Sequence, residues 1–109
     1  MNLKNYIFEK LRINKDTKSI HSGPLSNEDE KEIKNKMADI IKNYLQNNLN
    51  LSTNDYITDM STHEYIGLYL PEKTHLNLDI VGDSLYGLLK PLCTKPFKVY
   101  GRIIYFYFT

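Results

Sequence analysis

The chain has 109 residues, of which 41% are hydrophobic, 25% are charged and one is a cysteine, and its formal net charge is +1. This length fits one domain, and the nearly balanced charge excludes a strongly basic nucleic-acid module and a highly acidic DNA mimic. One cysteine excludes an intrachain disulfide framework and a multi-cysteine metal site, and no apolar run approaches the about 18 residues that cross a membrane.

Residues 1–25 are predicted to form an N-terminal helical arm followed by a linker. Four side chains recur on one face of a helix expected over residues 2–12, namely Leu3, Tyr6, Ile7 and Leu11. A helix this short is marginal in isolation, so we expect this face to dock on a partner. Residues 14–25 are polar and end in Ser-Gly-Pro-Leu, which is typical of a linker.

The next segment, residues 26–49, predicts a long amphipathic helix. Ser26 suits the N-cap, and Asp29 stands three residues later, where a capping-box acid belongs. The helix is expected to end near Asn47 and Asn48. One apolar stripe follows the helical period: Ile33, Met37, Ile40, Ile41, Tyr44, Leu45 and Leu49.

Beyond this helix, the period of the apolar residues changes to that of strands. Residues 54–59 predict a short strand. Residues 64–70 and 75–80 each alternate apolar and polar side chains and are separated by a turn-sized segment. This pattern predicts a β-hairpin with one wet face.

The C-terminal part predicts a short helix and a long strand. Residues 84–90 carry spaced leucines, and Asp83 would serve as their N-cap. Residues 97–108 form one β-type run, which Gly101 would bulge or bend. We therefore predict an α+β fold over residues 26–109, with one long helix packed on an antiparallel sheet of three to five strands.

The end of the chain is unusually aromatic, since Tyr105, Phe106, Tyr107 and Phe108 are consecutive. Alternate rings would point to opposite faces of a strand, so that strand must be central or must meet another chain. We predict that four residues of this segment contact a partner: Lys98, Arg102, Tyr105 and Tyr107. We also predict that the chain can form a homo-oligomer through this strand. Stacking on single-stranded nucleic acid is not expected, because basic residues are few.

Charge is uneven along the sequence. Residues 51–89 carry six acidic side chains and one basic one, whereas residues 90–109 carry four basic side chains and no acidic one. The two segments either neutralise each other as neighbours or form a two-sided polar surface that steers a partner.

Few residues suggest catalysis. His63, His75 and Asp79 could meet across the predicted hairpin as a zinc or proton-transfer site, although surface histidines are the simpler interpretation. Cys93 has no catalytic partner nearby in sequence and is interpreted as a free thiol. We therefore predict a protein that is not an enzyme and that holds no metal or cofactor.

The opening residues carry a resemblance. The segment Met1 to Leu11 contains Ile7-Phe8-Glu9 and resembles leader segments of tailed-bacteriophage proteins. In large myoviruses such leaders target internal head proteins to the capsid and end in an aliphatic–any–Glu cleavage signal. Asn14 to Thr17 also resembles openings from phages of gut Bacteroidetes. Abundant Lys, Asn, Ile and Tyr with one Ala fit an A/T-rich genome.

The resemblance implies a phage accessory or virion-associated protein, such as head cargo, that works by binding proteins. It would be found in the virion or in the host cytoplasm. Two alternatives remain: a phage-encoded inhibitor of a host defence enzyme, and a small metal-dependent hydrolase or nuclease built on His63, His75 and Asp79.

Overall fold

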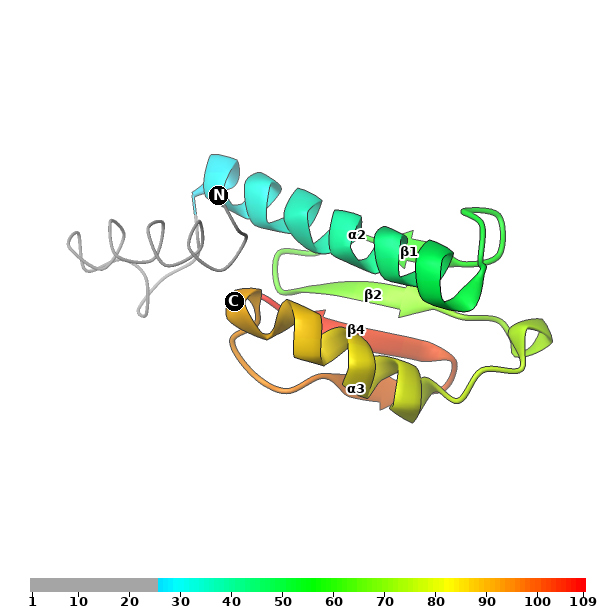
Figure 1. The fold of residues 1–109 in the computed structure, drawn as a ribbon. Helices are drawn as coiled ribbons and strands as arrows, with labels where there is room; N and C mark the ends of the chain where they lie inside the picture. Colours follow the sequence, from blue (N-terminus) through cyan, green and yellow to red (C-terminus); the bar gives the residue numbers. More distant parts are fainter. Residues whose placement is uncertain (1–25) are drawn as a thin grey trace.

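The computed structural model describes residues 26–109, which form a four-stranded antiparallel sheet with two helices on one face (Figure 1). The sheet has the order β1-β2-β4-β3. The elements in chain order are α2 (Asn27–Leu49), β1 (Ile57–Asp59), β2 (Tyr65–Tyr69), a 3-10 turn (Glu72–Thr74), α3 (Leu78–Leu89), a second 3-10 turn (Lys90–Leu92), β3 (Lys98–Tyr100) and β4 (Ile103–Tyr107). This arrangement confirms the predicted α+β class.

The predicted arm and linker, residues 1–25, lie outside the described residues. Four of the predicted partner-binding residues belong to this segment: Leu3, Tyr6, Ile7 and Leu11.

Helix α2 confirms the prediction for residues 26–49. The Ser26 hydroxyl oxygen accepts a hydrogen bond from the backbone N–H of Asp29 at 3.2 Å, which satisfies a donor of the first turn. The helix ends at Leu49, one residue beyond the expected end at Asn47 and Asn48. Its C-cap, Asn50, adopts the left-handed conformation with φ 55°. Its buried apolar stripe consists of Ile33, Met37, Ile41 and Leu45.

The predicted strand 64–70 is confirmed as β2, whereas the strand predicted over 54–59 is shorter. The first residues of that segment belong to a turn, because the Asp55 carboxylate accepts hydrogen bonds from the backbone N–H and the hydroxyl of Ser52. Only Ile57–Asp59 then extends far enough to pair with β2.

The strand predicted over 75–80 is wrong, and so is Asp83 as a cap. Asn77 is the N-cap of α3, because its side-chain oxygen accepts from the backbone N–H groups of Asp79 and Ile80. Asp83 therefore lies inside the helix. Six alternating residues also fit the start of a helix whose buried positions recur every three or four residues, and these are Leu78, Val81, Leu85 and Leu89.

The single strand predicted over 97–108 is also wrong, because Gly101 reverses the chain. Tyr100 pairs with Ile103, which leaves a two-residue turn of Gly101 and Arg102 between β3 and β4. Gly101 has φ +63°, whereas the φ of Arg102 is not positive. This is the pattern of a type II′ hairpin turn, which favours glycine at the first of its two central positions.

The sheet positions β4 between β2 and β3, so the aromatic C-terminal strand is central. Each helix is followed by an antiparallel pair of strands, and the last strands of the two units, β2 and β4, lie side by side (Figure 1). Both helices cover the same sheet face, whose side chains form the core with them: Ile66, Leu68, Ile104 and Phe106.

Candidate functional site

The sheet face opposite the helices is the candidate functional site, and we call it the open face. Side chains alternate along a strand, so the residues between the core positions point to this side. None of the segments within residues 26–109 forms a layer over it (Figure 1). The strand register assigns ten residues to the open face: Ile57, Asp59, Tyr65, Gly67, Tyr69, Lys98, Tyr100, Ile103, Tyr105 and Tyr107.

The middle of the open face is a cluster of three tyrosine rings. The Tyr65 ring makes edge-to-face contacts with the rings of Tyr105 and Tyr107. The ring centroids are 4.9 and 5.9 Å apart, and the interplanar angles are 90° and 71°. The ammonium group of Lys95 lies 4.2 Å from the centroid of Tyr107, and that of Lys98 lies 5.9 Å from it. Edge-to-face and cation–π contacts restrain the orientations of these rings.

One row across the open face carries opposite charges at its two ends. The register orders this polar row as Asp59, Gly67, Tyr105 and Lys98. Asp59 lies on the outer strand β1 and Lys98 on the outer strand β3, so the acidic and basic ends are at opposite edges of the sheet.

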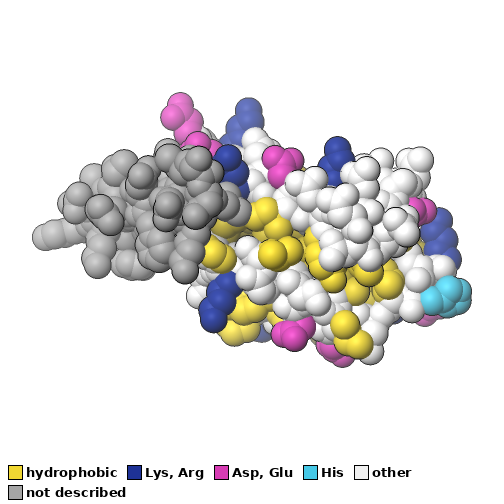
Figure 2. Space-filling model, viewed as in Figure 1, with side chains coloured by type: hydrophobic (Ala, Val, Ile, Leu, Met, Phe, Trp, Pro, Cys, Tyr) yellow, Lys and Arg dark blue, Asp and Glu magenta, His cyan; other side chains and the backbone are white. Residues whose placement is uncertain are grey.

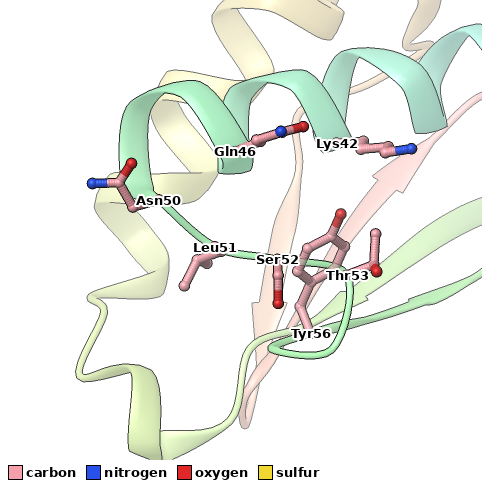
Figure 3. Close-up of a pocket in the computed structure, with 7 residues that line it drawn as sticks. All are labelled: Lys42, Gln46, Asn50, Leu51, Ser52, Thr53 and Tyr56. Atoms are coloured by element: carbon pink, nitrogen blue, oxygen red, sulfur yellow. The ribbon is translucent and has the colours of Figure 1, made fainter.

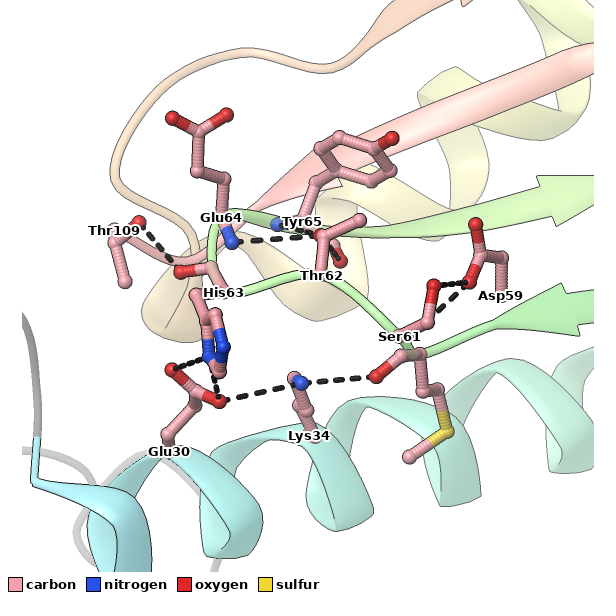
Figure 4. A network of polar contacts seen from close by, with 10 residues as sticks. Glu30, Lys34, Asp59, Ser61, Thr62, His63, Glu64, Tyr65 and Thr109 are labelled. Carbon is pink, nitrogen blue, oxygen red and sulfur yellow. Dashed lines mark hydrogen bonds and ion pairs between the residues drawn. The ribbon is translucent and has the colours of Figure 1, made fainter.

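The pKa values of Tyr65 and Asp59 are both shifted by the groups that surround them on the open face. Burial raises the pKa of Tyr65, and the neighbouring Tyr105 and the negative charges of the Asp59 and Glu64 carboxylates add to the rise. The Ser61 hydroxyl and backbone N–H donate to the Asp59 carboxylate at 2.6 and 2.9 Å, which lowers the pKa of that group and keeps it charged. Figure 4 shows Tyr65 and Glu64 projecting away from α2.

A second row across the open face is apolar. The register orders it as Ile57, Tyr69, Ile103 and Tyr100. Ile57, Tyr69 and Tyr100 are 62%, 37% and 81% exposed. Tyrosine is enriched where proteins bind one another, and a contiguous apolar patch marks an interaction site more often than isolated exposed residues do.

The structure brings together three of the four predicted C-terminal contact residues: Lys98, Tyr105 and Tyr107 all belong to the open face. Arg102 does not join them. Its guanidinium donates to the backbone carbonyls of Leu70, Pro71 and Leu76 at 2.8, 3.3 and 3.1 Å, so it holds the β2–α3 connection.

Sequence reasoning missed the residues of the open face that come from other strands. They are Ile57, Tyr65, Tyr69, Tyr100 and Ile103, together with Lys95 beside the face. The alternation of Tyr65, Gly67 and Tyr69 was the available signal, but it could not say which side of the sheet the helices cover.

The three residues considered for catalysis are not brought together. His63 precedes β2, whereas His75 follows the 3-10 turn beyond the other end of β2, and Asp79 lies in the first turn of α3. The hairpin that would have joined the histidines does not form, because residues 78–89 are helical. Within residues 26–109, no group of three or more His, Cys, Asp or Glu side chains is placed to hold a metal ion.

His63 instead belongs to a polar contact between α2 and the loop before β2 (Figure 4). Its Nδ1 lies 2.8 Å from Glu30 Oε2, and the Lys34 ammonium lies 3.3 Å from the same oxygen and donates to the Met60 carbonyl. Burial alone would raise the pKa of Glu30, but the hydrogen bonds from His63 and Lys34 outweigh it and lower the pKa. The cluster therefore ties α2 to the sheet.

Cys93 is unsuited to nucleophilic catalysis. Burial raises the pKa of its thiol to about 12, so the reactive thiolate is scarce at neutral pH.

Two hollows lie elsewhere on the molecule. One, of about 460 Å³, is lined by the C-terminal half of α2 and the following loop, and the Tyr56 ring points toward α2 there (Figure 3). The other, of about 480 Å³, lies between α2 and α3 beside Tyr44 and Leu88. Figure 2, which is viewed as Figure 1, shows hydrophobic side chains at the surface on this side of the molecule. Amide and hydroxyl side chains line much of both hollows, and neither contains a titratable cluster for chemistry.

Comparisons of the chain with protein-family models, with curated proteins and with solved structures find no match. Of the helices in the described part of the chain, none combines the length and the apolar character needed to cross a membrane.

Proposed function

We propose that this protein is not an enzyme and that it acts by binding another protein chain through the open face. The observation that carries the proposal is the apolar row, in which an isoleucine and two tyrosines are exposed beside a rigid tyrosine cluster. Such rings supply a large contact area at a low cost in conformational entropy, because a tyrosine has few rotatable bonds.

A protein partner fits the open face better than a nucleic acid does. Bases stack on exposed ring faces and phosphates need several cations. Here Tyr65 and Tyr105 pack edge to face at 90°, and the ammonium groups of Lys95 and Lys98 lie 4.2 and 5.9 Å from the ring centroid of Tyr107. The carboxylates of Asp59 and Glu64 near Tyr65 would repel a phosphate backbone.

Binding is also favoured over hydrolysis by the placement of the polar groups. The Glu30 carboxylate and the His63 imidazole face each other across an interface that stabilises the fold, and the Cys93 thiol is largely protonated. A metal-dependent hydrolase would need ligands from a further chain or from residues outside 26–109.

We further propose a phage origin, with the protein carried in the virion or released into the host cytoplasm. The support is the leader-like Ile7-Phe8-Glu9 segment. Mass spectrometry of purified virions is expected to detect the chain, with a peptide beginning at Lys10 if the leader is cleaved. A chain found only in infected cells would favour the alternative, an inhibitor of a host defence enzyme.

Site-specific photocrosslinking tests the open face directly. A benzophenone amino acid replaces Tyr100 on the open face or, as a matched control, Leu88, which is 51% exposed on the helical side. We expect irradiation in the native host to join a protein to position 100 and much less to position 88. Equal yields at the two positions, or nucleic acid joined at position 100, would contradict the proposal.

A further inference from the structure

We propose that the partner of the open face is a second copy of this chain, bound face to face around a two-fold axis parallel to the strands. This inference rests on the proposed function, because it names the occupant of that surface. Two physical features of the face support it: the order of its charges and the placement of its most exposed side chains.

The charges of the polar row are self-complementary around such an axis. A two-fold rotation parallel to the strands, centred between β2 and β4, reverses the strand order of the second copy and preserves its rows. Asp59 of each copy then faces Lys98 of the other, because these residues end the same row on opposite edges. A two-fold axis perpendicular to the strands would instead place like charges together, which is unfavourable.

The apolar row supports the same pairing. In the same orientation, Ile57 of one copy lies over Tyr100 of the other, so the two most exposed side chains of this row, 62% and 81% exposed, become covered. Two packed sheets of this kind are separated by about 10 Å, a gap that tyrosine and lysine side chains can fill.

The size of the face sets the expected strength. Strands about 4.8 Å apart and five residues of about 3.4 Å each give four strands a projected area of about 300 Å². This footprint lies below what the standard interfaces need, since they bury about 1,200 Å² or more in total, and an interface this small is expected to be weak and transient. We therefore expect reversible dimerisation at micromolar concentrations or above, weakened by salt because part of it is electrostatic.

Sedimentation velocity of the full chain over a concentration series at low salt tests the proposal. The wild type is expected to shift from monomer to dimer. Lys98→Glu and Asp59→Lys each replace two attractive contacts by two repulsive ones, and each should weaken the dimer about tenfold or more. The double variant with both changes restores opposite charges in this geometry and should recover dimerisation, whereas Lys42→Glu, on α2, should leave it unchanged.

A separate variant guards against loss of the turn at Asp59, whose carboxylate accepts from Ser61. Asp59→Asn keeps an oxygen acceptor, removes the charge and should weaken the dimer less than Asp59→Lys does. Circular dichroism confirms that each variant folds.

Three results would overturn the self-pairing: a wild type that stays monomeric, single variants that dimerise like the wild type, or a double variant no better than the singles. A monomeric wild type that still crosslinks a different protein at position 100 would leave the proposed function standing. Absence of any protein adduct there would remove both.

Discussion

Gly82 lies inside α3, where the absence of a side chain makes room for the ring of Phe97. A Cβ at this position would stand 2.5 Å from Cε2 and 2.8 Å from Cδ2 of that ring. The ring has little freedom to move, because it packs against Tyr86 and Phe106 with centroids 5.8 and 6.1 Å apart. Gly82→Ala therefore overpacks the contact between α3 and the sheet.

The expected magnitude follows from two opposing effects. Overpacking costs about 1–3 kcal/mol, whereas replacing a helical glycine by alanine stabilises by about 0.5–1 kcal/mol. We expect Gly82→Ala to lower the free energy of unfolding by about 1 kcal/mol, which corresponds to a fall in Tm of about 4–8 °C for a domain of this size. Thermal and urea unfolding followed by circular dichroism measure both quantities.

Gly87 in the same helix provides the matched control, since a Cβ there would meet nothing within 4 Å. Gly87→Ala should stabilise the protein by up to about 1 kcal/mol through helix propensity alone. In a Phe97→Leu background, where the ring is gone, Gly82→Ala should lose most of its cost. If both alanine variants raise Tm equally in the wild-type background, the packing of Phe97 on α3 is not as described.

Three further predictions concern the contacts around the sheet. Arg102→Lys cannot reproduce the fork that binds three backbone carbonyls and should destabilise the fold by about 1–3 kcal/mol in urea unfolding; an unchanged midpoint would contradict this role. Glu30 has a lowered pKa, so its stabilising contribution is present above the ordinary value of 4.5 and is lost as the pH falls through the native pKa. Glu30→Gln should therefore be less stable at neutral pH and lose less on acidification, and parallel acid-dependence curves would refute the linkage. Cys93, whose pKa is raised to about 12, should react slowly with iodoacetamide in the native protein and rapidly in denaturant. Rapid native labelling would show that the thiol is accessible and ionised.

The sequence could indicate the faces of the sheet only where residues that are neighbours in the chain are also neighbours in space. Tyr105 and Tyr107 alternate with buried Phe106 and Phe108, so one strand already indicated two distinct faces. It could not indicate that Tyr65 would complete the ring cluster or that Asp59 would end the row of Lys98. Those relations depend on strand order and register, which are set by long-range pairing.

Arg102 illustrates the same boundary from the opposite side. Its sequence position beside Lys98 and the aromatic run suggested a basic contact surface. The type II′ turn at Gly101 instead places its guanidinium beside the carbonyls of Leu70 and Pro71, which follow β2, and of Leu76, which precedes α3. Buried or half-buried carbonyls require donors, and the nearest fork of donors meets that requirement.

The sequence by itself determined the long helix, because a capping serine and six turns of helical periodicity agree with each other without reference to any other segment. It also determined the α+β class and the core strand β2. Only the tertiary structure decided between strand and helix for residues 75–80, because six alternating residues fit both periods. In the fold, Asn77 caps α3 and the buried leucines of that helix pack against the sheet. The tertiary structure also decided which sheet face stays open, because packing of both helices on one side is a property of the whole chain.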